Sequence, residues 1–166
     1  MEHFLARRIT HLNLPQRFLK ARESLMSHFR PILNHFGVTE QQWRILRVLD
    51  EHGQLEPREM CELCQILSPS MTGVLSRMEE LGLIQRERVA ADQRRILVRL
   101  AAKGDRVIDE IAPLIERQYG LIEEAYGSAV VDDLSRALQD FIAAQVKPVQ
   151  RVALPETTRA VNSRRP

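Results

Sequence analysis

The sequence predicts a mainly α-helical fold in which two short helices and a two-stranded β-hairpin lie between longer helices. Three observations support this prediction. Apolar residues recur at helical spacing along much of the 166-residue chain. Residues 68–100 then change from helical spacing to two strand-like runs around a polar tip. Long apolar stripes flank this part of the chain, at residues 14–37 and 105–147.

The composition limits the classes of protein to consider. A chain of 166 residues that is 44% hydrophobic is long enough for one domain with a proper core. The net charge of +2 is small, so the positions of the arginines, and not their total, must indicate any nucleic-acid partner. No apolar run reaches the roughly 18 residues of a membrane span, and the N-terminus lacks the apolar core of a signal peptide. We expect a cytoplasmic protein without membrane contact.

Two helices are predicted in the first third of the chain. Residues 1–13 are expected to form a flexible N-terminal arm, and Pro15 begins a long helix that ends at Gly37. Pro31 lies inside this helix and is expected to kink it. The second helix follows Thr39-Glu40-Gln41-Gln42, which is a capping sequence with an acidic residue in the first turn.

Two short helices follow in close succession after Gly53. The first covers about residues 57–63, and the second begins at Ser68-Pro69 and ends at Gly82. Ser68 is expected to cap the second helix, because Pro69 suits the first helical position. Two short helices joined tightly form a helix-turn-helix.

A basic hairpin completes this region. Residues 83–88 and 95–100 have strand composition, and residues 89–94 form a polar tip, so we expect a two-stranded wing. A helix with small side chains beside a basic wing suits the grooves of DNA. The candidate DNA-binding residues are Ser68, Ser70, Met71, Thr72, Ser76, Arg77, Arg86, Arg88, Gln93, Arg94 and Arg95.

The second short helix offers several kinds of contact to DNA. The hydroxyl groups of Ser70, Thr72 and Ser76 are expected to reach base edges or phosphates, and Met71 is expected to contact a thymine methyl group. The first turn of a recognition helix is where bases are normally contacted. The alternative for these side chains is ordinary capping and solvent exposure.

The wing is expected to act through its arginines. Arg94 and Arg95 are predicted to enter the minor groove, where a narrow A·T-rich groove strengthens the negative potential. The other wing arginines are expected to meet phosphates or to pair with Glu87; these are Arg86, Arg88 and Arg99.

The terminal helices are predicted to form a dimer. The stripe over residues 105–147 contains Pro113, which is expected to bend it, and Gly127, which divides it into two helices. With residues 14–37, these apolar faces exceed what a small winged domain needs to cover itself, so we expect a homodimer. Two recognition helices then reach major grooves about 34 Å apart, which predicts an inverted-repeat operator. Residues 148–166 are expected to be a disordered basic tail.

The remaining chemistry of the chain is sparse. Cys61 and Cys64 form a C-x-x-C pair, but no second pair completes four zinc ligands, so no metal is expected. The five histidines are scattered and no phosphate-binding glycine loop is present, which argues against an enzyme and against a cofactor. Two alternatives stay open: an oxidant-sensing repressor that uses both thiols, and a protein-interaction module, which would leave the arginines unexplained.

This order of elements resembles the MarR family of dimeric winged helix-turn-helix regulators. Four segments carry the resemblance, which covers about residues 14–145: Thr39–Trp43, Arg77–Ile84, Asp92–Arg94 and Leu100–Gly104. The stretches Ala21–Glu23, Met26–Ser27, Phe29–Pro31 and Thr39–Arg44 are similar to the subgroup that controls homoprotocatechuate (4-hydroxyphenylacetate) catabolism. The resemblance implies a DNA-binding domain at residues 38–104 and an Asp92 carboxylate that holds Arg94 or Arg77.

The sequence departs from the family at two places. Ala101 stands where the family usually has a threonine able to cap the next helix, and its presence is expected to fray that end. Gly73 lies within the recognition helix, where glycine costs roughly 1 kcal/mol against alanine. We expect that Gly73 permits close approach to DNA.

The resemblance also implies a small effector. It points to a repressor of aromatic or N-heteroaromatic acid catabolic genes that a hydroxyphenylacetate or hydroxynicotinate releases from DNA. Such a ligand needs a cation for its carboxylate and apolar walls for its ring. The candidate residues are Arg22 as the anchor, Met26, Phe29 and Trp43 as walls, and His28 as a hydrogen-bond donor. Core packing is the open alternative for the three apolar side chains.

Overall fold

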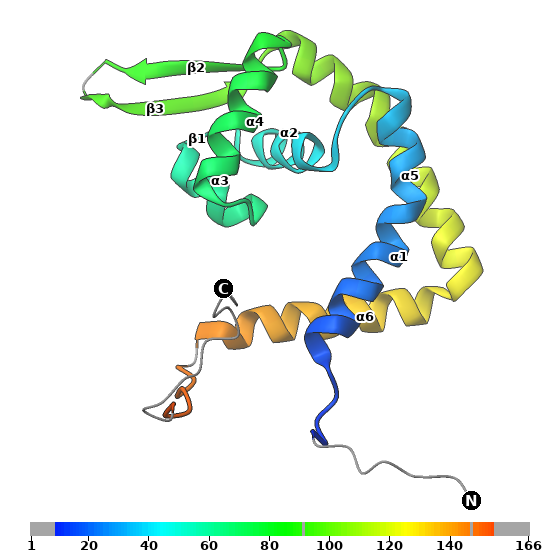
Figure 1. Cartoon of the computed structure of the whole chain (residues 1–166). Coiled ribbons are helices and arrows are strands. Elements are labelled where there is room, and N and C mark those ends of the chain that lie inside the picture. The colour runs from blue at the N-terminus through cyan, green and yellow to red at the C-terminus, as the bar shows by residue number, and fades with distance from the viewer. Residues whose placement is uncertain (1–8, 91, 147, 155–166) are drawn as a thin grey trace, which may run out of the picture. The chain divides into compact units, whose positions relative to one another are not determined.

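The computed structural model describes residues 9–90, 92–146 and 148–154, and Figure 1 shows their arrangement. Much of the predicted N-terminal arm (1–13) and basic tail (148–166) lies outside these residues. Within the described ranges, none of the helices has both the length and the apolar character that a membrane crossing requires. The chain forms two compact units, residues 1–122 and 123–166.

The order of elements confirms a mainly α-helical fold with a small sheet. The first unit holds α1 (Leu14–His35), α2 (Glu40–His52), β1 (Gln54–Leu55), α3 (Pro57–Cys64), α4 (Ser68–Glu80), β2 (Ile84–Val89), β3 (Asp92–Leu100) and most of α5 (Ala102–Tyr126). The second unit holds the end of α5, α6 (Ser128–Ala143) and the 3₁₀ turn Ala144–Val146. The α3–α4 pair and the β2–β3 hairpin lie where the sequence predicts them.

One helix start follows the predicted chemistry, and another does not. Thr39 and Gln42 form the predicted capping box, with each side chain hydrogen-bonded to the other residue's backbone N–H. The prediction that Ser68 caps α4 is wrong, because Leu67 is the capping residue and Ser68 is already helical. Pro69 tolerates this earlier start, since a backbone N–H in the first turn has no partner within the helix.

Prolines inside the long helices do not end them. α1 continues through Pro31 and α5 continues through Pro113. Each proline lacks the N–H that would bond to the carbonyl four residues earlier, which is why a bend is predicted at each of these points. Both bends stay predictions. The predicted breaks after α2 and α4 lie at Gly53 and Gly82, which have φ angles of 76° and 71° that suit glycine.

The sheet has three strands, and the sequence predicts only two. β1 pairs with β3, and β3 pairs with β2, both in antiparallel register. A strand of two residues is too short to show alternation, so no sequence pattern indicates β1. It extends the base of the wing, where Leu55 pairs with Val98 and becomes buried.

The two faces of the wing have different surroundings. Residues directly opposite each other share a face, so Ile84, Val98 and Arg86 lie on one face and Glu87 lies on the other. Ile84 and Val98 are only 2% and 0% exposed. We call the face that contains them the inner face of the wing, and the face that contains Glu87 the outer face.

One core holds the helix-turn-helix to the wing and to α2. Its most buried members come from several elements; they include Leu33, Ile45, Leu46, Leu49, Met60, Met71, Leu75, Met78, Ile84, Val98 and Ile111. The rings of Phe29 and Tyr119 lie 4.8 Å apart and join α1 to α5 within the first unit. In the second unit, none of the α6 residues is buried.

Candidate nucleic-acid interface and effector site

The exposed side of α4 carries small polar residues. Ser70 and Thr72 are exposed, Ser76 is half-buried, and the Thr72 hydroxyl donates to the Ser68 carbonyl at 3.3 Å. The expectation that Met71 contacts a thymine methyl is wrong for this conformation, because Met71 is only 1% exposed. Its spacing from the buried Leu75 places both on the core side of the helix.

Gly73 and Leu67 complete this surface. Gly73 is exposed, and a Cβ atom placed on it would meet no other atom within 4 Å. Leu67, at the capping position before α4, is 80% exposed and can offer an apolar contact beside the hydroxyl groups. Sequence reasoning missed Leu67, although an apolar residue directly before a recognition helix is a signal that was available.

Carboxylates hold two arginines that were expected at the DNA. Arg86 Nε donates to Glu79 Oε2 at 2.8 Å, which joins β2 to α4, and Arg77 Nη1 donates to Glu80 Oε2 at 3.1 Å. The Arg86 guanidinium holds the pKa of the Glu79 carboxyl below its usual range. Of the two alternatives expected for Arg86, pairing with Glu87 is therefore wrong, and contact with a phosphate stays a prediction.

The outer face of the wing holds two further ion pairs. Arg95 Nε donates to Glu56 Oε1 at 2.6 Å, and Arg99 Nη2 donates to Glu87 Oε1 at 2.5 Å. The expectation that Arg99 pairs with Glu87 is confirmed. Each guanidinium group therefore has a carboxylate partner, while its side chain stays about half exposed, at 56% for Arg95 and 48% for Arg99.

Arg88 and Arg94 differ from these neighbours. In the part of the chain that the structure describes, neither side chain forms an ion pair. Arg88 lies opposite Ile96 on the inner face. Arg94 lies between Asp92 and Ile96, where the pairing of β3 with β2 shifts register, so simple alternation does not assign it to a face. The Asp92 carboxylate accepts from the backbone N–H of Arg94 at 3.0 Å. The implied contact with the Arg94 or Arg77 guanidinium is therefore replaced by a backbone contact. Gln93 lies on β3 at the tip of the wing, between Asp92 and Arg94.

Four charged side chains join α1 to the start of α2. Arg22 Nη2 donates to Glu40 Oε2 at 2.6 Å, and Arg30 Nε donates to Glu40 Oε1 at 2.5 Å. Arg30 also donates to both oxygens of Glu23, at 2.5 and 2.6 Å. Hydrogen bonds from Arg30 and then Arg22 hold the pKa of the Glu40 carboxyl below its usual range. The Glu23–Arg30 spacing of seven was a detectable signal, since such residues share a helix face.

The predicted effector residues fall into two groups. Arg22 keeps 48% of its side chain exposed despite its pairing with Glu40, and Trp43 lies one turn beyond Glu40 on α2. Trp43 and Phe29 are only 8% and 6% exposed, which fits core packing in the single chain. Met26 and His28 are half-buried; they lie on α1.

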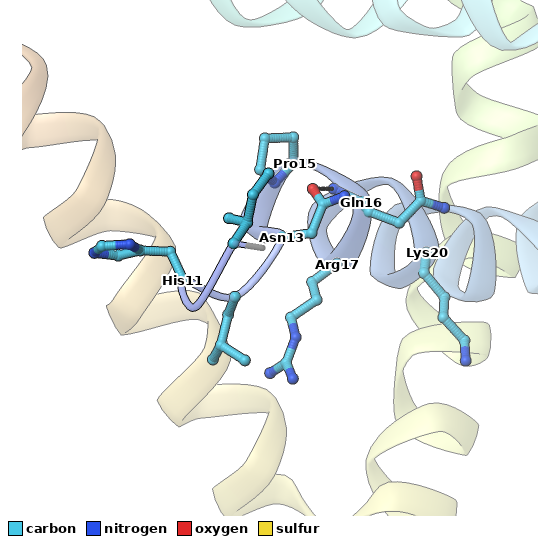
Figure 2. A pocket seen from close by; sticks show the side chains of 8 residues that line it. His11, Asn13, Pro15, Gln16, Arg17 and Lys20 are labelled. Atoms are coloured by element: carbon cyan, nitrogen blue, oxygen red, sulfur yellow. Dashed lines mark hydrogen bonds between the residues drawn. The ribbon is translucent and has the colours of Figure 1, made fainter. Parts of the chain in front are cut away.

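A hollow of about 730 Å³ lies elsewhere, at the N-terminal end of α1 (Figure 2). There the Asn13 side chain accepts a hydrogen bond from the Gln16 backbone N–H at 3.1 Å, which caps the helix. Arg17 and Lys20 project from the same side of α1 in this view. All eight lining residues are exposed, and none of them is a predicted effector residue.

The cysteines occupy a structural position. Cys64 is 2% exposed, its thiol donates to the Arg44 carbonyl at 3.7 Å, and Arg44 Nη1 donates to the Cys64 carbonyl at 2.7 Å. Burial raises the pKa of the Cys64 thiol, which disfavours the reactive thiolate. Among the described residues, no group of three or more side chains is suited to hold a metal ion.

Comparison with known proteins identifies the family. The sequence profile of the MarR family matches residues 36–95. The regulator FarR of Neisseria gonorrhoeae is 41% identical over 117 residues, which cover 70% of this chain and 80% of that protein. The chain belongs to the MarR family. A second relative of this MarR-family chain is the homoprotocatechuate degradative operon repressor of Escherichia coli, 38% identical over 133 residues, which cover 80% and 90% of the two chains.

A solved structure supports the same assignment. The crystal structure of NadR in complex with 4-hydroxyphenylacetate matches with a TM-score of 0.71 and 38% identity, over 81% of this chain and 96% of that one. The predicted resemblance to the MarR family and to the homoprotocatechuate repressor subgroup is therefore confirmed, as is the winged helix-turn-helix fold. The relatives are transcriptional regulators, and this MarR-family chain is one as well.

Proposed function

We propose that this MarR-family protein is a dimeric repressor that leaves an inverted-repeat operator when it binds a small hydroxylated aromatic acid. One observation carries the DNA-binding part of the proposal. α4 carries exposed hydroxyl groups, and on the wing Arg88 and Arg94 have no ion-pair partners among the described residues. Small side chains admit a helix to the major groove, and unpaired guanidinium groups attract phosphates.

In this proposal α4 lies in the major groove and the wing tip in the adjacent minor groove. Ser70 and Thr72 reach base edges or phosphates from the first turn of α4, and Ser76 follows one turn later. Arg94 enters the minor groove, and Arg88 meets a phosphate. The DNA-binding domain covers residues 38–104.

The dimer is proposed to form through residues 14–37 and 105–147. In the first unit Leu19 of α1 is 58% exposed, and in the second unit Val130 and Ile142 of α6 are 60% and 62% exposed. Apolar side chains on long helices are typical of a surface that a second copy covers. The two-fold axis then sets half-sites about one helical turn apart, with recognition helices roughly 34 Å from each other.

The effector is proposed to bind near Arg22, between the dimerisation helices and the winged domain. Arg22 is the exposed cation for a carboxylate. Met26 lies one turn along α1 from Arg22, and Trp43 lies one turn along α2 beyond Glu40, the ion-pair partner of Arg22. The names of two relatives support an aromatic acid: the homoprotocatechuate operon repressor and the NadR complex with 4-hydroxyphenylacetate. An effector carboxylate competes with Glu40 for Arg22, so it favours a different position of α2. DNA affinity then falls by the ratio of the effector's affinities for the two states.

Binding to labelled DNA from the region upstream of the protein's own gene tests this proposal. We expect a two-fold symmetric footprint, a dimer by light scattering, and release of the DNA by 4-hydroxyphenylacetate or a hydroxynicotinate. A monomer that ignores every fragment at low salt would overturn the DNA-binding proposal. DNA binding that no aromatic acid weakens would overturn only the effector.

A further inference from the structure

Each strand of the wing is joined to one helix of the helix-turn-helix by an ion pair. On β2, Arg86 pairs with Glu79 of α4. On β3, Arg95 pairs with Glu56, the residue that precedes α3. The first pair uses the inner face of the wing and the second uses the outer face.

The pair on β3 supports a part of the wing that β1 does not reach. The β1–β3 ladder ends where Leu55 pairs with Val98. Arg95 lies three residues closer to the tip than Val98, which is roughly 10 Å along a strand. The backbone of Glu56 is held at the start of α3, because its N–H donates to Glu59 Oε2 at 2.8 Å.

We propose that Glu56 and Arg95 form a clamp that positions the wing for operator binding, and that Arg95 does not itself contact the DNA. This inference rests on the proposed function and replaces the expectation that Arg95 enters the minor groove. The Arg95 guanidinium already has a carboxylate partner, whereas its neighbour Arg94 forms no ion pair with the described residues. By holding β3 against the start of α3, the clamp fixes the direction in which Arg94 points.

The clamp and simple electrostatics predict opposite changes in DNA affinity when the charge of Glu56 is removed. A carboxylate near DNA repels phosphates, so the loss of the Glu56 charge alone should strengthen binding to any duplex. If Glu56 positions the wing, the same loss should weaken operator binding, because Arg94 must then be ordered when the complex forms. Ordering one long side chain and its strand corresponds to roughly a twofold to tenfold loss of affinity.

Three variants and one matched control separate these possibilities. Glu56→Gln, Arg95→Gln and the double variant are compared in operator affinity at several salt concentrations. Glu62→Gln is the control, because Glu62 lies on α3, which begins directly after Glu56, its substitution removes the same charge, and its one ion pair among the described residues is with Arg58 of α3, at 3.8 Å. Thermal unfolding of each variant reports whether it folds.

The clamp predicts that both single variants lose affinity, that the double variant is no worse than either, and that the dependence on salt stays unchanged. The control should bind as tightly as the wild type or more tightly.

If Glu56→Gln binds as tightly as Glu62→Gln, the clamp is wrong. If only Arg95→Gln weakens binding and its salt slope falls by about 0.9, Arg95 contacts a phosphate and the inference is overturned. Should Glu56→Gln fail to fold, the salt slope of Arg95→Gln decides alone. A wild type that binds no operator refutes the proposed function instead.

Discussion

Gly73→Ala should make the free protein more stable and its DNA complex weaker. Gly73 lies inside α4, and an added Cβ atom meets nothing within 4 Å. Alanine is therefore expected to stabilise the helix by roughly 0.8–1 kcal/mol, since glycine is the poorer helix former. For a chain of this size, that gain raises the melting temperature by roughly 2–4 °C.

The same methyl group should impair DNA binding, because it projects from the exposed side of the proposed recognition helix. Forcing a methyl group into a close-packed contact costs about 1–3 kcal/mol, which is roughly a fivefold to hundredfold loss of affinity. Differential scanning calorimetry and fluorescence anisotropy with operator DNA measure the two effects. Gly120→Ala is the matched control for the gain in stability alone, since Gly120 also lies inside a helix with open space around it, on α5, within the segment proposed to form the dimer. It should gain stability. Undiminished operator affinity of Gly73→Ala would show that α4 does not approach the DNA closely at this position.

Four further predictions follow from the described contacts. Arg94→Ala should weaken operator binding roughly fivefold to a hundredfold and reduce the salt slope by about 0.9, with an unchanged melting temperature; anisotropy titrations measure both. Arg22→Ala should weaken 4-hydroxyphenylacetate binding roughly tenfold to a hundredfold in calorimetry, and equal affinity would remove Arg22 as the anchor. Glu40→Gln should lower stability at neutral pH, and the difference from wild type should vanish as the pH falls through the lowered pKa of Glu40, because the ion pairs exist only while Glu40 is charged. Iodoacetamide should label Cys64 slowly in the folded protein, whereas rapid labelling would revive the oxidant-sensing alternative.

Local chemistry explains which parts of the fold the sequence predicts. The capping box at Thr39 and the glycine breaks at Gly53 and Gly82 depend on residues that are neighbours in the chain, and all are present. β1 was missed because it exists only through its pairing with β3, more than 40 residues later. The predicted cap at Ser68 failed because an exposed leucine one position earlier adopts the extended backbone conformation instead.

On α4, the sequence prediction of the DNA-contacting residues was wrong at Met71. Which face of α4 is exposed was predictable in principle, since Met71 shares the spacing of the buried Leu75 and Met78. Reading Met71 as a DNA contact gave more weight to its place in the first turn than to this periodicity. The structure therefore reduces the predicted contact set on α4 to its hydroxyl-bearing residues.

Charge is where the structure changes the prediction most. The sequence contains a cluster of wing arginines, but the number of arginines overstates the unpaired positive charge of the wing. Three of them pair with carboxylates that lie 7 to 39 residues away in the sequence. Only the folded chain shows which arginines these are. The partners divide the wing into arginines that hold it to the helices or to its other strand and arginines without an ion-pair partner among the described residues. A substitution that simply removes a positive charge cannot distinguish these roles. Paired substitutions of an arginine and its carboxylate can, because only an arginine that holds the wing shares its effect with a partner.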